Sequence, residues 1–167
     1  MKYLRVLFIG MLLSMMGCSM PWDDAPPIND ELGDYSYRAN MAYFDEEGTK
    51  VAEKQASGSM LLSTNGISIY PKQGWVYSIN FANVQEHLLS TGEKIITFNI
   101  ESQEVYINEF SFLIIGLSAY DVTDPDGTII GQFDGWIDEN NEIKFSCESL
   151  NISAKTKTLT SYTGAKR

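Results

Sequence analysis

Carboxylates are the most numerous side chains in this sequence that can take part in catalysis. The 167 residues include 22 Asp and Glu but only 12 Lys and Arg, so the formal charge is −10. A typical glycosidase holds two carboxyl groups about 5–10 Å apart. Asp134 and Asp138 are the best candidates for such a pair, because they share one face of a predicted strand beside Trp136. The same alternation is typical of the solvent side of a strand, which is the interpretation we favour.

A second group of acids invites comparison with a calcium loop. Asp121, Asp124 and Asp126 lie close before Gly127, and carboxylate oxygens in loops bind hard cations. When Gly127 is aligned with the glycine of an EF-hand loop, however, apolar residues fall at both anchoring positions. Asp-Pro-Asp-Gly is also a strong turn signal. We therefore predict a turn at this place, with no metal and no cofactor.

Histidine and cysteine are too few for the usual catalytic arrangements. His87 is the single histidine, whereas a serine or cysteine hydrolase needs an imidazole beside its nucleophile and a zinc site needs several ligands. We predict a surface position for His87, in a short helix over residues 83–89. Cys147 shares a strand face with Ile143 and Phe145, which predicts a buried apolar role. No nucleophile elbow, P-loop or dinucleotide fingerprint is present, so we predict a protein that is not an enzyme.

Aromatic residues are the remaining candidates for ligand contact. Trp136, Trp75 and Tyr77 could stack on sugar rings or line an apolar cavity. Trp136 shares its face with Gln132 and Asp134, a mixture that suits a glycan. Core packing and cross-strand pairing are the competing roles for all three.

These residues must be positioned by β-strands, because apolar residues alternate with polar ones along most of the chain. Turn signals such as Thr64-Asn65-Gly66 separate about nine or ten predicted strands. Residues 110–117 are apolar on both faces, which predicts a central or twice-covered strand. A shift of the apolar face predicts a bulge or kink near Glu148-Ser149.

The strand pattern predicts an all-β domain built as a single antiparallel meander. Gly131 and Gly135 lie on the same face of one predicted strand over residues 129–137, and small inward residues favour a closed barrel over the alternative, a β-sandwich. We assign the barrel-like domain to residues 35–153 and a basic strand or tail to residues 154–167. The interior is either hollow or filled by phenylalanines (Phe98, Phe112, Phe133 and Phe145).

The first residues predict a secretory signal. Two positive charges, Lys2 and Arg5, precede an apolar run over residues 6–16 that is shorter than the ~20 residues needed to span a bilayer. Gly17-Cys18 follows and resembles a bacterial lipobox, in which the cysteine is acylated and becomes the new N-terminus. We therefore predict a signal peptide over residues 1–17 and lipidation at Cys18.

Residues 18–34 read as a tether between this lipid and the domain. The segment contains Pro21, Pro26 and Pro27 together with five acids, and it lacks an apolar period. Asp23-Asp24 is either an acidic export signal or plain solvated linker. The excess of acids argues against binding to nucleic acids and to anionic lipid surfaces, so the lipid itself must provide the membrane attachment.

These features together resemble those of a known group of proteins. The Gly17-Cys18 signal, the short acidic tether and a β domain with the hairpin Gly-x-Ile-Asp-x-Asn-Asn-x-Ile at residues 135–143 are similar to small Bacteroidetes lipoproteins with calycin-like barrels. That resemblance implies a bacterial outer-membrane location, on either side of the membrane, and a fold that often holds an apolar ligand. The lipocalin Gly-x-Trp motif is absent near the first strand, so no functional residue is carried over.

The sequence as a whole predicts a lipid-anchored binding or accessory protein that takes a small apolar ligand or a glycan. A structural or adhesive surface subunit, joined through exposed strand edges, is the first alternative. An acid-pair glycosidase is the second. The oligomeric state stays open.

Overall fold

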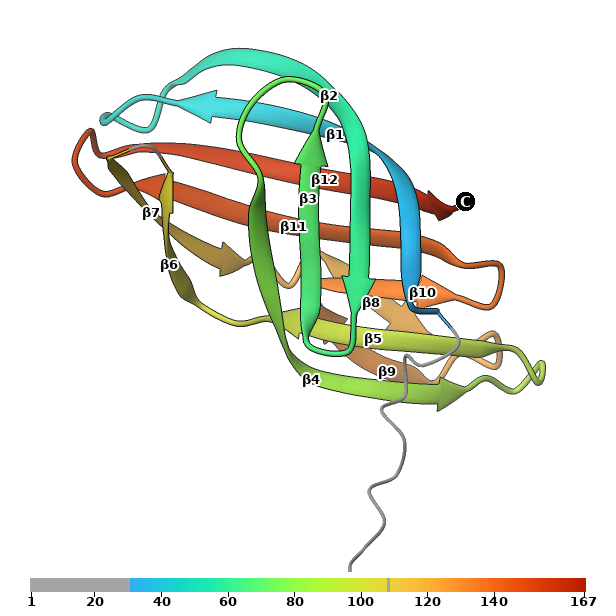
Figure 1. Ribbon diagram of the computed structural model, residues 1–167. Helices are drawn as coiled ribbons and strands as arrows, with labels where there is room; N and C mark the ends of the chain where they lie inside the picture. The colour runs from blue at the N-terminus through green and yellow to red at the C-terminus, as the bar shows by residue number, and fades with distance from the viewer. Residues whose placement is uncertain (1–30, 108) are drawn as a thin grey trace, which may run out of the picture.

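The computed structural model describes residues 31–107 and 109–167, which form twelve β-strands and no helix (Figure 1). The strands are β1 Gly33–Phe44, β2 Lys50–Ser63, β3 Gly66–Pro71, β4 Tyr77–Leu88, β5 Lys94–Ile100, β6 Gln103–Ile107, β7 Phe110–Gly116, β8 Tyr120–Thr123, β9 Ile129–Phe133, β10 Gly135–Asp138, β11 Glu142–Asn151 and β12 Thr156–Lys166. The prediction of an all-β fold is confirmed.

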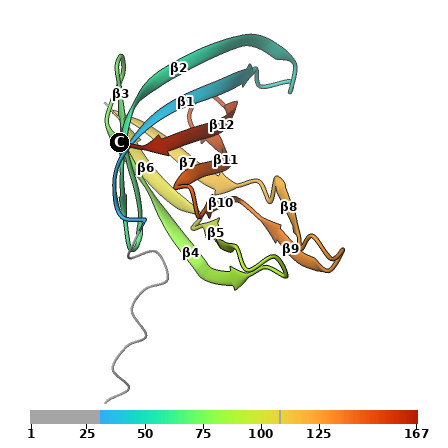
Figure 2. The same cartoon turned by 90° about the vertical axis from the view of Figure 1, so that its right-hand side faces the viewer.

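Ten of these strands belong to one antiparallel sheet that curls into a ring. Eight strands follow one another in the order β10-β5-β4-β3-β2-β1-β12-β11, and β11 pairs again with β10 to close the circuit. Figure 2 shows the curl, with β1 and β2 on one side and β4 and β5 on the other. The fold is thus barrel-like, as predicted, although only Gly135 of the two glycines lies in the ring, since Gly131 is on β9.

The ring forks at β11, because this strand changes neighbours along its length. Its first part, around Ile143 and Phe145, pairs with β10, whereas Cys147 to Asn151 pair with β7. The strand pair β7-β6 therefore forms a flap of sheet that extends the wall at one end of the ring. This fork creates two different halves in the interior.

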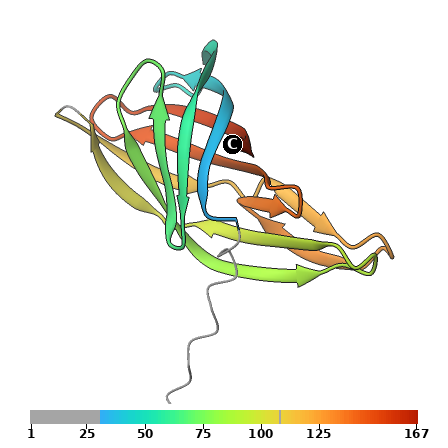
Figure 3. The ribbon, with the colours of Figure 1, turned by 45° about the vertical axis from the view of Figure 1, so that its right-hand side comes forward.

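The small hairpin β8-β9 forms its own two-stranded sheet beside the ring. Figure 3 shows it lying next to the projecting hairpin β4-β5. The Asp124 carboxylate joins the two hairpin ends, since it accepts hydrogen bonds from the backbone amide of Ser90, at 2.9 Å, and from the Ser90 hydroxyl. The hydroxyl contact lowers the pKa of Asp124.

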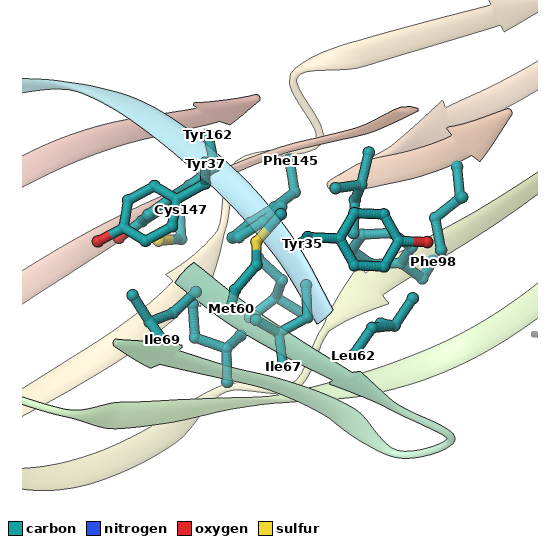
Figure 4. Packing of buried hydrophobic residues seen from close by; sticks show 14 of the residues in the cluster. Tyr35, Tyr37, Met60, Leu62, Ile67, Ile69, Phe98, Phe145, Cys147 and Tyr162 are labelled. Carbon is teal, nitrogen blue, oxygen red and sulfur yellow. The ribbon is translucent and has the colours of Figure 1, made fainter. Parts of the chain in front are cut away.

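One half of the ring is filled by large apolar side chains. Figure 4 shows them meeting from opposite walls, with Met60 and Ile67 between Tyr35 at one end and Tyr37 at the other. Phe98 and Phe145 are fully buried, and each such burial contributes roughly 1.5–3 kcal/mol. This half of the interior is therefore a packed core.

Gly135 allows the two central phenylalanines to approach one another. In the pleat it lies between Phe98 of β5 and Phe145 of β11, its register partners on either side. A Cβ at this position would come within 2.5 Å of both side chains and within 2.7 Å of the Lys144 carbonyl oxygen. The ring can close here only because the residue is glycine.

We expect Gly135→Ala to lower the free energy of unfolding by about 1–3 kcal/mol, as overpacking of a rigid site does. Gly164→Ala is the matched control, because its new methyl group would mainly meet the flexible end of Met60. Urea denaturation of both variants measures the difference. Equal losses at the two positions would contradict a rigid contact at Gly135.

The predicted helix over residues 83–89 is wrong, because this segment continues β4. The strand carries a bulge between Ala82 and Gln85, where Asn83 has a φ of 51°, a conformation that asparagine tolerates. The bulge shifts the register so that β4 can keep pairing with β5 as far as Leu88. Pairing with β5 therefore satisfies the backbone hydrogen-bonding groups of this segment, which in a helix would bond within the segment itself.

No bulge forms near Glu148-Ser149, where the sequence predicts a bulge or kink. The pairing of β11 with β12 runs without a shift from Glu142 to Asn151. The apolar face changes sides because the interior changes: Ser149 points into a cavity, while Leu150 lies opposite Leu113 of β7.

Residues 110–117 do form a central strand, because β7 lies between β11 and β6. The twice-covered alternative is wrong, since Ile115 on the outer face of β7 is exposed.

The predicted strand over residues 129–137 is two strands that meet at Asp134. The first, β9, pairs with β8 outside the ring, and the second, β10, enters the ring between β5 and β11. The chain changes sheets at Asp134, whose side chain is buried. Alternation alone cannot reveal such a change, because both strands keep the same period.

The predicted boundaries of the domain need adjustment at both ends. Glu31, placed in the tether by the sequence, is buried and its carboxylate lies 2.6 Å from the Lys94 ammonium. At the other end, residues 156–166 form β12, an inner strand between β1 and β11 that buries Tyr162. Gly33 and Asp34, also placed in the tether, begin β1, while the signal peptide, Cys18 and tether residues 18–30 lie outside the described residues.

Candidate functional site

The second half of the ring interior is hollow. A cavity of about 370 Å³ lies between β1, β12, β11 and the β6-β7 flap, a volume at the small end of the roughly 300–1,000 Å³ of ligand pockets. Its apolar wall is formed by Ala39, Met41, Val105, Ile107, Phe112 and Ile114. The interior is therefore filled in one half of the ring and hollow in the other.

Small side chains on the inward face create this space. Ala39 of β1 lies directly opposite Ala56 of β2, so two neighbouring strands present only methyl groups at this level. Ser149, Thr158 and Thr160 occupy the inward positions of β11 and β12, where the packed half has Phe145 and Tyr162. The strands run on with the same register, and only the side-chain volume changes.

Tyrosine hydroxyls and a thiol separate the cavity from the core. The hydroxyl groups of Tyr77 and Tyr162 hydrogen bond across the ring, and the Tyr37 ring packs 5.6 Å from that of Tyr162. Phe145 stacks on the other side of Tyr162 with a centroid distance of 4.4 Å. Burial raises the pKa of all three tyrosines, so these hydroxyls stay neutral.

Cys147 lies in the same layer and is buried, as its strand position predicts. Burial, with a smaller contribution from the charge of Asp134, raises the pKa of its thiol to about 12. A raised pKa means that the folded state keeps its proton longer than the unfolded state. The contribution of the protonated Cys147 thiol to stability is therefore complete below about pH 9 and is lost as the pH rises toward 12.

We expect the Cys147 thiol to react with a disulfide reagent at pH 8 roughly a hundredfold more slowly in the folded chain than in denaturant, because it is both buried and protonated. The measurement uses Cys18→Ser, so that Cys147 is the only thiol. Similar rates with and without denaturant would show that the thiol is exposed.

The opening of the cavity lies beside the connection between β3 and β4. Pro71, Gln73, Gly74 and Trp75 line it here, and the Trp75 side chain is 59% exposed. The amide of Lys72 donates to the Ser57 carbonyl oxygen at 3.0 Å, which holds this connection against β2. An indole that lies both at the rim and in water is well placed to meet an entering ligand.

Two of the three predicted aromatic residues lie at this cavity. Trp75 is at its rim and Tyr77 is in the tyrosine layer. Trp136 lies elsewhere, on the outer face of β10, where the Lys144 ammonium packs 4.9 Å from the centre of its ring. The predicted glycan face around Trp136 is wrong, because Gln132 lies on β9 outside the ring and the Asp134 side chain is buried.

The sequence predicts that Asp134 lies on the solvent side of a strand, and this prediction is wrong. It is 5% exposed, and its carboxylate accepts hydrogen bonds from the backbone amides of Ile100, at 2.7 Å, and Ser118. The Asp138 carboxylate accepts from the amides of Asn140 and Glu142 within the β10-β11 turn. Both acids thus hold backbone amides, which is a structural role.

The candidate calcium residues do not converge. Asp121 accepts a hydrogen bond from Gln132 at 2.7 Å, whereas Asp124 is held by Ser90 and Asp126 by the amide of Thr128. Among the residues that the structure describes, no three His, Cys, Asp or Glu side chains are grouped as a metal site requires.

His87 lies on β4 and not on a helix. Its Nε2 is 2.8 Å from the hydroxyl of the buried Thr97, and its ring lies 5.8 Å from that of Phe133. Burial lowers the pKa of His87. It is thus half-buried between two hairpins and is not a simple surface residue.

Sequence reasoning missed most residues of the cavity. Tyr37 was visible as an inward position of an alternating strand, but alternation does not show where a ring is hollow. Tyr162 and Thr160 were missed because the C-terminal segment was read as a frayed strand or tail. The useful signal was the opposed pair Ala39 and Ala56, which becomes apparent only when the register of β1 and β2 is known.

A comparison of the chain with protein-family models and with curated proteins finds no match. Within residues 31–107 and 109–167, no helix combines the length and apolar character that a membrane crossing requires.

Proposed function

We propose that this chain is a lipid-anchored protein of the bacterial cell envelope that binds a small apolar molecule in the hollow half of its ring. The observation that carries the proposal is the cavity itself: it is open at Trp75, mainly apolar in its walls and bounded below by a packed core. An empty cavity of this size lowers stability, because its walls lose packing contacts that a bound ligand would restore. Its presence therefore favours a binding role over a structural one.

Among ligands, an apolar molecule is favoured over a glycan. The aromatic side chains that lie at the cavity, Trp75 and Tyr77, are accompanied by aliphatic neighbours such as Val105 and Ile107. Sugar-binding sites instead combine aromatic rings with many polar groups, and the only such mixture predicted from the sequence is around Trp136, on the outer face.

Titration with N-phenyl-1-naphthylamine, a probe whose fluorescence rises in apolar surroundings, tests the proposal. We expect saturable binding to one site per chain, with energy transfer from Trp75 that Trp75→Phe reduces. Trp136→Phe is the matched control and should leave the transfer mostly unchanged. Fluorescence that rises without saturation would contradict a defined site.

The lipid anchor is proposed from the Gly17-Cys18 motif, and the resemblance to Bacteroidetes lipoproteins favours the outer membrane. We expect radiolabelled palmitate to be incorporated into the wild-type chain expressed in a bacterial host and Cys18→Ala to abolish the label. Cys147→Ala is the control and should keep it, because that thiol is buried in the domain. Label that persists in Cys18→Ala would exclude this anchor.

A structural or adhesive subunit is the second candidate. Among the described strands, β6 lies at the end of the sheet order, and Tyr106 on it is 75% exposed. An unpaired edge can accept a strand from another chain. Sedimentation over a wide concentration range distinguishes the two roles, since a binding protein stays monomeric while a strand-pairing subunit forms larger species.

A further inference from the structure

Within the described part of the chain, the side chains that line the cavity carry no formal charge. Among the described residues that line it, there is no Asp, Glu, Lys, Arg or His. Its polar groups are all neutral: tyrosine, serine and threonine hydroxyls, one glutamine amide and the Cys147 thiol. A ligand inside meets the donors and acceptors of these residues, while the Lys54 ammonium lies outside the lining, 5.5 Å from the centre of the Tyr43 ring.

The absence of a counterion penalises any charged ligand. An ion that enters a low-dielectric space loses its hydration, and only an opposite charge or several hydrogen bonds can compensate for it. The raised pKa values of Cys147 and Tyr162 show the same effect on the chain's own groups, because burial disfavours the thiolate and the phenolate. The charge of Asp134 also acts on Cys147, so a negative potential reaches this layer.

The hydroxyl layer nevertheless offers hydrogen bonds to a neutral oxygen. Tyr77 and Tyr162 share one hydrogen bond between their hydroxyls, and an oxygen-bearing ligand can donate to or accept from this pair. Thr158 and Thr160 place two further hydroxyls on the wall of β12. An uncharged molecule with one polar end therefore matches both the apolar walls and the tyrosine layer.

We propose, on the basis of the binding function above, that the cavity selects uncharged, mainly apolar molecules that carry a hydroxyl or carbonyl oxygen, and that it rejects fatty-acid carboxylates and other ions. The selection resides in the walls, through the lack of a compensating charge, and not in the acidic surface of the chain.

Two probes with the same aromatic skeleton provide the test. N-phenyl-1-naphthylamine is neutral, and 8-anilinonaphthalene-1-sulfonate differs by one sulfonate group. The full chain should bind the neutral probe at least about tenfold more tightly. The preference should persist in 0.5 M NaCl, where surface charges are screened beyond roughly 4–5 Å. A preference below tenfold, or one that disappears in salt, overturns the proposal.

Competition experiments extend the test to aliphatic molecules. Dodecanol should displace the neutral probe at a concentration at least about tenfold lower than dodecanoate at pH 8. Equal displacement by the two would overturn the neutral selection while leaving the binding function intact. If no probe binds saturably, it is the proposed function that fails.

A charge placed in the wall should reverse the preference. Thr158 is half-buried at the cavity, so the ammonium of Thr158→Lys has access to both water and ligand. We expect this variant to bind the sulfonate probe at least about tenfold more tightly than the wild-type chain. Thr163→Lys, on the outward face of β12, is the control and should change sulfonate binding by less than about threefold. An equal gain in both variants would attribute the preference to surface charge.

Discussion

Asp134→Ala is expected to lower the free energy of unfolding by about 2–4 kcal/mol, since a buried hydrogen bond to a charged acceptor contributes about 1.5–3 kcal/mol and a second, partly exposed one contributes less. The Asp134 carboxylate accepts from the amides of Ile100 and Ser118 at the point where the chain passes from β9 to β10. Gly116 packs so closely that a Cβ there would lie 1.8 Å from the carboxylate. Alanine would leave the buried amide of Ile100 without an acceptor, whereas the exposed Ser118 amide could turn to water.

Denaturant unfolding measures this loss, and two variants make the result specific. Asp134→Asn keeps one carbonyl acceptor, so it should lose less than alanine. Asp121→Ala removes an exposed carboxylate that bonds only to Gln132, and it should change stability by less than about 0.5 kcal/mol. A small effect of Asp134→Ala, comparable with that of Asp121→Ala, would show that the carboxylate does not support the strand junction.

The same acid is relevant to the glycosidase alternative. A general acid must reach a substrate, whereas the Asp134 carboxylate is occupied by two backbone amides and nearly excluded from solvent. If this alternative were right, Asp134→Asn would abolish cleavage of a sugar substrate in a chain that remained folded. Our account expects Asp134→Asn to affect stability first.

Ala56→Phe is expected to weaken binding of the neutral probe by roughly thirtyfold or more, because the new ring would occupy the space that the ligand needs. Ala56 lies opposite Ala39 in the wall of β2 and is half-buried, so the larger side chain can enter the cavity without displacing the packed half. We therefore expect stability to be kept or slightly raised, as happens when a void is filled.

Ala42→Phe is the matched control for this variant. Ala42 lies on the opposite face of β1, in a separate groove that it lines with Asn40, Glu53 and Gln55, so the same increase in volume does not reach the cavity. The apolar run over residues 6–16 is present in the wild type and in both variants, so any probe that it binds is the same in all three. A difference in affinity between the variants therefore reports on the cavity. Unchanged affinity in Ala56→Phe would move the binding site elsewhere.

The strands were the most predictable feature of this fold, because inward and outward residues alternate along them. The pattern of Tyr35, Tyr37 and Ala39 indicates a strand face, and Gly135 indicates a tight wall. Features that depend on a neighbour were not predictable: the bulge at Asn83, the change of sheet at Asp134 and the two partners of β11 all result from pairing with distant segments.

The candidate site was only partly predictable for the same reason. Trp75 and Tyr77 can be selected by residue type and local context, but Trp136 has an equally good context and lies outside the ring. What distinguishes them is the interior volume, which depends on the register of several strands and on where small residues meet. Ala39 and Ala56 belong to different strands and are separated in the sequence, and only the pairing of β1 with β2 places them together.

An NMR titration of the ¹⁵N-labelled full chain with N-phenyl-1-naphthylamine tests the central claim most directly, because it locates the ligand without assuming a site. Our account predicts that the largest amide shifts occur at Ala39, Ala56, Cys147 and Thr160, and that Phe98 in the packed half changes little. Largest shifts at Trp136 and Lys144, which lie away from the cavity, or no saturable shift in the ring at all, would contradict the claim that the hollow half is a binding site.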